Sequence, residues 1–259
     1  MKELMTNQQK CPDWGVAVGQ PNVREEDHTM KQVPTLYTLF STYLNSGPVP
    51  EGYGWTASYW SVEARRPKYH DHALPAAIRQ GFAATIEEEI TTMPSPISGI
   101  CYLGLDVSGS MGYPIENKSL VRCIDVASLT YTVICRNNQN ARVLPFSTKV
   151  HDTALDPKRT VTETTAQLIS LYGTGTNPEE VLRVLNALGA EGTTVVVVSD
   201  YDAKAGQEWD RFKKRNPKAR MVCLNLAPRP IERQPVGGVL YLDGFSDATF
   251  DKMTEFVGS

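Results

Sequence analysis

Three oxygen-bearing side chains alternate along one short stretch of the chain, at Asp106, Ser108 and Ser110. The apolar run 100–105 before them is rich in strand formers, and the glycine-containing stretch after them suits a tight turn. This pattern predicts a strand that carries one carboxylate and two hydroxyls at its C-terminal end, where open α/β sheets bind ligands. Carboxylate and hydroxyl oxygens are hard ligands that suit Mg²⁺ better than Zn²⁺. The sequence therefore predicts a divalent-cation site.

Two further stretches carry the oxygens that such a site still needs. Thr176 lies in the glycine-rich stretch 173–177, just before an expected helix, and Asp200 follows an expected valine-rich strand at 193–198. Right-handed crossovers bring the C-terminal ends of parallel strands to one edge of a sheet, so all three loops can converge. The three hydroxyls are expected to bind the ion, and the two carboxylates to bind it directly or through water. The expected ligands are Asp106, Ser108, Ser110, Thr176 and Asp200.

This set of ligands indicates what the ion would do. Three neutral oxygens and two carboxylates leave a bound Mg²⁺ (or Mn²⁺, or Ca²⁺) electrophilic, and Mg²⁺ keeps waters for which the protein offers no ligand. A carboxylate or phosphate from another molecule can replace one of these waters. We therefore expect a metal-dependent binding module whose ion bridges to a protein partner that supplies an acidic residue.

The elements that must position these loops alternate regularly from residue 74 onward. Helices are expected at 74–93, 120–135, 163–171, 177–188, 206–215 and 247–257, and strands at 100–106, 141–146, 148–152, 193–198, 220–226 and 239–242. Strand–helix alternation of this kind is typical of an α/β fold with a doubly wound, mostly parallel central sheet flanked by helices. We expect residues 74–259 to form this domain.

The first 73 residues show no such alternation and are expected to form an irregular N-terminal extension or arm. Prolines and glycines interrupt residues 1–31, although 35–44 has a helical apolar face. Aromatic residues gather at Tyr53, Trp55, Tyr59 and Trp60, and we interpret them as packing against the main domain rather than stacking on bases. Limited proteolysis is expected to trim the arm up to about residue 70 and to leave a stable core.

Composition narrows the class of protein. With 259 residues and 41% hydrophobic content, the chain can bury one good core. Its formal charge of −3 gives RNA binding no support.

The five cysteines lack C-x-x-C spacing and are interpreted as buried thiols in a reducing compartment. Without a signal-like start or an apolar run of about 18 residues, we expect a cytoplasmic protein with no membrane contact, or alternatively a component of a virion.

The motifs, taken together, point to a known family. Asp-Val-Ser-Gly-Ser at 106–110, Gly-Thr-Gly-Thr at 173–176 and Ser-Asp at 199–200 resemble the metal-ion-dependent adhesion site (MIDAS) of von Willebrand factor A domains. The resemblance covers roughly residues 98–257. It implies a Rossmann-like fold, and it implies that the five residues above are the metal ligands.

Within that family the sequence is most similar to the A domain of Ro (TROVE) ring proteins. The likeness rests on Phe82 in the entering helix, on Gly175-Thr176, on Ala205-Gly206 and on the stretch 242–245, Leu-Asp-Gly-Phe. Ro proteins carry a long ring of helical repeats that encloses RNA ends. The residues before position 98 are too few to form such a ring. Encirclement of RNA is therefore not implied.

Enzymatic interpretations account for the same residues less well. Hydrolysis by two carboxylates needs an acid with a shifted pKa, whereas Asp106 and Asp200 are better explained as metal ligands. Ser108 is not in a nucleophile-elbow sequence, and His151 has no evident orienting partner. We therefore expect that the protein is not an enzyme and has no catalytic residue.

Two other functions stay open beside the binding module. One is a Ro-like accessory role in RNA metabolism. A modest basic edge would carry it, formed by Lys213, Lys214, Arg215 and Lys218. The other is a structural subunit of a virus or phage particle that uses an A-domain fold. An oligomer or a larger assembly is compatible with the binding module and with the structural subunit.

Overall fold

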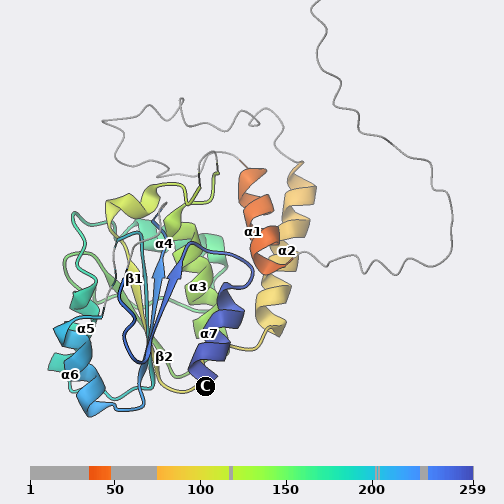
Figure 1. Ribbon diagram of the computed structural model, residues 1–259. Helices are drawn as coiled ribbons and strands as arrows, with labels where there is room; N and C mark the ends of the chain where they lie inside the picture. Colours follow the sequence, from red (N-terminus) through yellow and green to blue (C-terminus); the bar gives the residue numbers. More distant parts are fainter. Residues whose placement is uncertain are drawn as a thin grey trace, which may run out of the picture. The chain divides into compact units, whose positions relative to one another are not determined.

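The computed structural model describes residues 35–47, 75–116, 119–201, 203, 205–227 and 233–258. They contain a five-stranded sheet in the order β2-β1-β3-β4-β5, in which every neighbouring pair is parallel (Figure 1). The strands are β1 (Cys101–Asp106), β2 (Ala141–Phe146), β3 (Thr194–Ser199), β4 (Arg220–Asn225) and β5 (Val239–Asp243). The prediction of a doubly wound, Rossmann-like α/β fold is confirmed.

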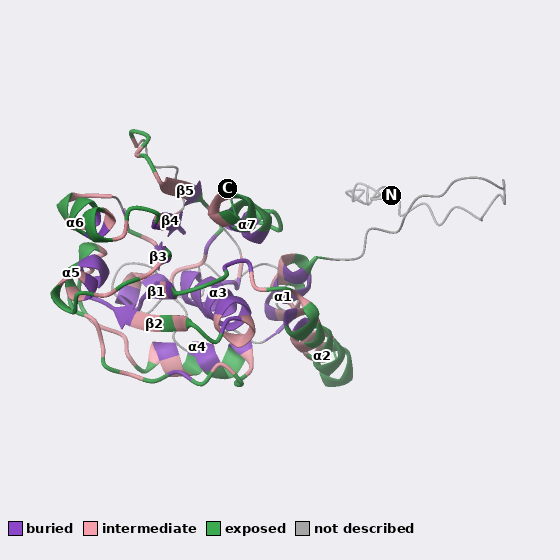
Figure 2. Cartoon of the chain, turned by 90° about the horizontal axis from the view of Figure 1, so that it is seen from below, coloured by how far each residue is buried: buried purple, intermediate pink, exposed green. Residues whose placement is uncertain are grey.

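Helices cover both faces of this sheet (Figure 2). On one face lie α3 (Cys123–Asn137), α4 (Val161–Ile169) and α7 (Thr249–Gly258), and on the other α5 (Glu179–Ala187) and α6 (Gln207–Arg215). Each face has its own apolar cluster. Helix α3 is buried without interruption from Cys123 to Ile134, which explains why its sequence is mostly apolar. None of the described helices combines the length and the apolar character that crossing a membrane requires.

Strand β3 is buried on both faces, as its unbroken run of valines predicts. Val196 and Val198 contribute to the core beneath α3, and the alternate valines contribute to the core beneath α5 and α6. The register of β1 with β3 ends at the pair Leu105 and Val198. The next residues, Asp106 and Ser199, therefore lie side by side at the C-terminal edge of the sheet.

Helix α1 (Leu36–Asn45) is part of the compact unit, which begins at Pro34. Its apolar face is buried in the same core as α3 and consists of Leu36, Leu39, Phe40 and Leu44. Tyr37 packs edge-on against Phe245, with 5.1 Å between ring centroids. These contacts correct the domain boundary expected between residues 73 and 74, because a helix that buries four apolar side chains in the core is not an arm. The aromatic group at 53–60 and the interrupted stretch 1–31 lie outside the described residues.

Helix α2 (Ala76–Thr92) follows and enters the domain as expected. It buries Ile86 and Ile90, and Arg136 of α3 forms an ion pair with Glu87 at 2.7 Å. The four described cysteines are free thiols and three of them are buried, in agreement with the interpretation of the sequence. Cys11 lies outside the described residues.

The strand expected at 148–152 is absent from the described structure. The chain reverses after β2, and a single antiparallel bridge joins Phe146 to Val150. The His151 N–H then donates to the Pro145 carbonyl at 2.7 Å. Proline has no N–H to return, so the ladder ends there.

Candidate metal-binding site

Four of the five predicted ligands meet at the ends of β1 and β3. The Ser108 N–H donates to Asp106 Oδ1 at 2.7 Å. The hydroxyls of Ser108 and Ser110 are hydrogen-bonded at 3.1 Å, and Ser110 Oγ donates to Asp200 Oδ1 at 3.0 Å. A single chain of hydrogen bonds thus joins all four residues, although Ser110 and Asp200 are ninety residues apart.

A short 3₁₀-helix, η3 (Gly109–Gly112), shapes the turn after β1. Ser108 precedes it in an extended conformation, and the Ser108 carbonyl accepts the Met111 N–H at 3.1 Å. Met111 is fully buried, which anchors the turn to the core. The sequence predicted a turn here but not its 3₁₀ geometry.

Ser199 completes the arrangement, and sequence reasoning did not assign it a role. Its hydroxyl donates to Asp106 Oδ2 at 2.5 Å and accepts the Tyr201 N–H at 2.9 Å. Both oxygens of the Asp106 carboxylate are therefore held, one by Ser199 and one by the Ser108 N–H. The sequence does show a serine directly before Asp200. Its contact with Asp106, however, depends on the pairing of β1 with β3.

The loop that carries Thr176 is tied to the turn after β1. Gly109 donates to the Gly173 carbonyl at 3.1 Å, and the Gly173 N–H donates to the Val107 carbonyl at 3.0 Å. A β-carbon at 173 would lie 2.5 Å from Ser147 Oγ, and Gly175 has φ +74°, so both positions require glycine.

Thr176 itself is half-buried in this loop. In the part of the chain that the structure describes, its hydroxyl makes no hydrogen bond with Asp106, Ser108, Ser110 or Asp200. Its role as a ligand stays a prediction, supported by the backbone hydrogen bonds that tie its loop to the turn carrying Ser108 and Ser110.

The buried Asp106 carboxylate and the half-buried Asp200 carboxylate lie close together without a positive charge to compensate them. Burial raises the pKa of Asp106 from 3.8 to about 6, against the hydrogen bonds from Ser199 and Ser108, and nearby Asp200 raises it further. Burial also raises the pKa of Asp200. Within the described residues, no Lys, Arg or His forms an ion pair with either carboxylate. A divalent cation would supply the missing charge.

The donor atoms indicate which kind of cation fits. Across the described ranges, no group of three or more His, Cys, Asp or Glu side chains could hold a metal, so no Zn²⁺-type cluster is found there. The atoms gathered here are carboxylate and hydroxyl oxygens, which suit Mg²⁺ completed by water. The residues present therefore fit a hard cation.

His151 has a partner that the sequence did not reveal. Its Nε2 lies 3.0 Å from the Ser147 hydroxyl, and burial together with Lys149 lowers the pKa of the imidazole. Ser147 is 3% exposed and lies against Gly173, and its carbonyl accepts the Asn177 N–H at 2.8 Å. Ser147 therefore helps to hold the Thr176 loop, and His151 is hydrogen-bonded to Ser147.

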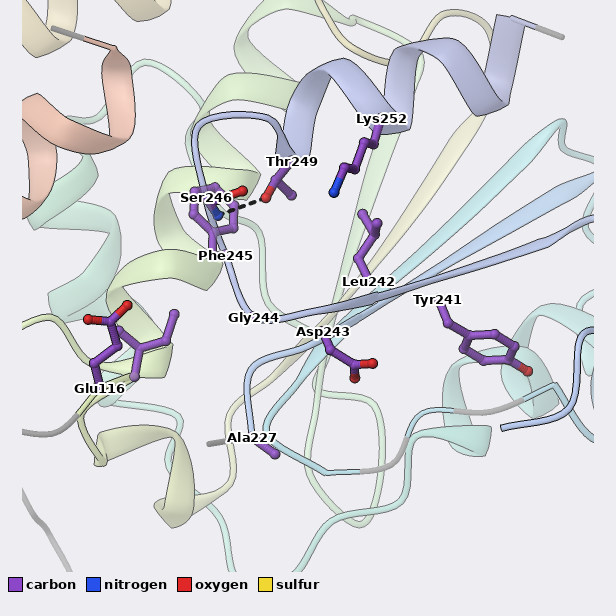
Figure 3. Close-up of a pocket in the computed structure, with 11 residues that line it drawn as sticks. Glu116, Ala227, Tyr241, Leu242, Asp243, Gly244, Phe245, Ser246, Thr249 and Lys252 are labelled. Carbon is purple, nitrogen blue, oxygen red and sulfur yellow. Dashed lines mark hydrogen bonds between the residues drawn. The ribbon is translucent and has the colours of Figure 1, made fainter. Parts of the chain in front are cut away.

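A cavity of about 380 Å³ lies at the same edge of the sheet, at the ends of β4 and β5 (Figure 3). Thr249, in the first turn of α7, lines it and accepts the Ser246 N–H at 2.9 Å. Asp243 also lines it, but its carboxylate already accepts hydrogen bonds from Asn225 at 2.7 Å and Arg233 at 3.1 Å. None of the five predicted ligands lines this cavity, so it is distinct from the candidate site.

Comparison with known proteins agrees with this fold. Residues 101–200 match the family model described as the Ro60 vWA domain. The fold is similar to the crystal structure of the Deinococcus radiodurans Ro (RSR) protein, with a TM-score of 0.66 and 15% sequence identity. That similarity covers 86% of this chain and 44% of the other, so this chain spans less than half of that protein's length. None of the curated proteins compared with the chain matches it.

The parallel sheet and the family match point to one class: the segment 101–200 is similar to a von Willebrand factor A domain. More particularly, this segment matches the Ro60 type of that domain, and the fold is similar to that of a Ro protein, in line with the resemblance of the motifs. The matched segment begins at the first residue of β1 and ends at Asp200, so it contains all five predicted ligands.

Proposed function

We propose that the chain is a non-enzymatic binding module that engages an acidic group of a protein partner through a divalent cation, as one component of a larger assembly. The observation that carries this proposal is the chain of hydrogen bonds from Asp106 through Ser108 and Ser110 to Asp200. It gathers one buried and one half-buried carboxylate and two hydroxyls at one sheet edge without a positive charge. Mg²⁺ is the preferred ion, with Mn²⁺ or Ca²⁺ as substitutes.

The protein's own residues would hold and orient the ion. Ser199 and the Ser108 N–H fix the Asp106 carboxylate in one orientation, so its position does not depend on the ion. Asp200 is oriented by the Ser110 hydroxyl. When bound, the cation supplies an electrophilic position that a partner's carboxylate can occupy, and Thr176 would add a further hydroxyl ligand.

A binding role fits these residues better than a catalytic one. Asp106 has both oxygens engaged by hydrogen-bond donors, which suits a ligand more than a proton-transfer group. The Ser147–His151 pair resembles a nucleophile with its base, but the hydroxyl is buried against Gly173. A substrate carbonyl would have no access to it.

The likeness to the Ro60 vWA domain favours a second candidate, an accessory role in RNA metabolism. The basic edge expected to contact RNA lies at the end of α6. There Lys213 donates to the Ala219 carbonyl and lies over the Trp209 ring, and Arg215 donates to Asn186 Oδ1 at 2.9 Å. These engagements leave fewer free cations for phosphates, so binding of a protein partner is our first choice. Measuring RNA affinity at several salt concentrations tests the alternative, because phosphate contacts weaken steeply with salt.

Replacing Thr176 by Ala tests the proposed function. With the tagged full-length chain as bait, we expect Thr176→Ala to reduce Mg²⁺-dependent partner capture about tenfold, by removing a ligand. The free energy of unfolding should change by less than about 1 kcal/mol, since the residue lies in a surface loop. Quantitative mass spectrometry of captured proteins, with and without chelator, and urea unfolding provide the two measurements.

Thr174→Ala is the matched control, since it removes an exposed hydroxyl from the same loop. It should leave both measurements unchanged. Equal losses of capture and stability in Thr176→Ala would show instead that the threonine only shapes the loop. Stoichiometric assemblies that persist in chelator would favour the structural-subunit alternative.

A further inference from the structure

The outer edge of β2 carries backbone groups that the sheet does not use. β2 is the outermost strand on one side of the sheet, opposite β5 (Figure 2). In a parallel ladder, alternate residues bond to a given neighbour. The Val107 N–H donates to the Phe146 carbonyl at 2.7 Å, so the even-numbered residues of β2 face β1. The backbone groups of Ala141, Val143 and Pro145 therefore point away from β1, toward the outer edge of the sheet.

At two of these three positions, the outward backbone groups are already hydrogen-bonded or, at Pro145, lack an N–H. Pro145 has no N–H, and its carbonyl accepts the His151 N–H at 2.7 Å. Ala141 donates into the turn before the strand at 3.1 Å, and its carbonyl accepts a hydrogen bond from the Arg142 guanidinium at 2.9 Å. Val143 is half-buried, and neither its N–H nor its carbonyl has a partner among the described residues. One donor and one acceptor thus remain open on the same residue.

A groove of about 570 Å³ runs beside Val143, between β2, the C-terminal half of α3 and the loop 153–158; we call it the Val143 groove. Its lining includes the apolar side chains of Tyr131, Ala141, Val143, Ala154, Leu155 and Pro157. A partner's apolar side chain could be buried there.

The charged residues that line the Val143 groove are all basic. Its lining includes Arg136, Arg142 and Lys158 and no acidic residue. Arg136 is paired with Glu87, but Arg142 and Lys158 are exposed, and neither forms an ion pair with any described residue. The neighbouring Asp156 does not line the groove, and its carboxylate accepts the Lys158 N–H at 2.9 Å.

We infer that the Val143 groove binds an extended acidic peptide segment of a partner protein, which adds a short strand to β2. A peptide backbone offers both a carbonyl for the Val143 N–H and an N–H for the Val143 carbonyl. A phosphate offers only acceptors and would leave that carbonyl unpaired, whereas one residue of an extended peptide pairs both groups at once. Acidic side chains of the segment would face Arg142 and Lys158. This site is separate from the proposed cation site and needs no metal.

The probe is a fluorescein-labelled heptapeptide of alternating glutamate and valine, titrated by anisotropy against the full-length chain in chelator. Chelator prevents its carboxylates from binding through an ion at Asp106. We expect binding, and Val143→Pro should weaken it about three- to tenfold by removing the outward N–H. Because that N–H is not used by β1 and Arg142 is already extended, the substitution leaves the ladder intact. Val143→Ala is the matched control and should bind like the wild type.

Three further arms complete the test. Reversing the charges, in Arg142→Glu with Lys158→Glu, should weaken binding about tenfold, and a lysine–valine heptapeptide should bind far less. Should Val143→Pro fail to fold, a probe with N-methylated valines tests the same hydrogen bonds on the wild-type chain and should also bind three- to tenfold more weakly. Equal binding of the N-methylated and unmodified probes would overturn strand addition. No binding of the acidic probe, or displacement of it by a uridine oligonucleotide at lower concentration than by unlabelled peptide, would overturn the acidic peptide as occupant.

Discussion

In chelator near pH 7, Asp106→Asn is expected to raise the free energy of unfolding by roughly 3 kcal/mol. The native pKa of Asp106 is about 6 and its ordinary value is 3.8. Between these values the folded chain binds more protons than the unfolded chain, so stability falls as pH rises from about 4 to about 6. Above that range the metal-free protein holds a buried carboxylate that lacks a counter-charge. Asparagine keeps the shape of the side chain and removes the charge.

The measurement is urea unfolding of both variants at several pH values in chelator. The stability difference between Asp106→Asn and wild type should be small near pH 4, grow up to about pH 6 and then level off. Taking the difference cancels the other titrating groups. A stability difference that does not change with pH would show that burial does not disfavour the ionised form of Asp106.

Adding Mg²⁺ should reverse the order of the two variants. An ion that binds only the folded state stabilises it by about 4 kcal/mol at one thousand times its dissociation constant, which exceeds the roughly 3 kcal/mol advantage of the variant in chelator. Wild type should gain this and Asp106→Asn should not, because the substitution removes a ligand charge. A wild-type melting temperature that does not respond to Mg²⁺ or Mn²⁺ would contradict the proposed site.

Phe40→Ala is expected to lower the free energy of unfolding by about 3 to 5 kcal/mol, the usual range when a buried phenylalanine is truncated in a core. Phe40 is 1% exposed and belongs to the cluster that also contains Ile86 and Leu129. The residue lies in the stretch that the sequence pattern assigned to an arm, so the size of the effect decides between the two assignments.

Thr42→Ala, at an exposed position of the same helix, is the control for helix propensity. It should change stability by less than about 0.5 kcal/mol. If Phe40→Ala also cost so little, α1 would not be part of the cooperative unit. Partner capture in Mg²⁺ should be unchanged in Phe40→Ala at temperatures where the variant stays folded, because α1 holds none of the predicted ligands.

Local pattern was enough for most elements of the fold. The valine run of β3, the apolar stripe of α1 and the alternation of strands with helices all reflect burial that neighbouring residues share, so periodicity shows them directly. The strand predicted at 148–152 was wrong for the opposite reason. Its composition suits a strand, but Pro145 on the adjacent strand cannot donate to a ladder, and that depends on which segments become neighbours.

The sequence by itself determined the oxygen-bearing side chains of Asp106, Ser108 and Ser110 and their place after a strand, because apolar composition shows where a buried strand ends. Only the tertiary structure decided that Ser110 reaches Asp200, that Ser199 holds Asp106 and that α1 belongs to the core. These contacts join residues far apart in the chain. They depend on the order and register of the strands, which follow from the lowest free energy of the whole fold and not from any one stretch.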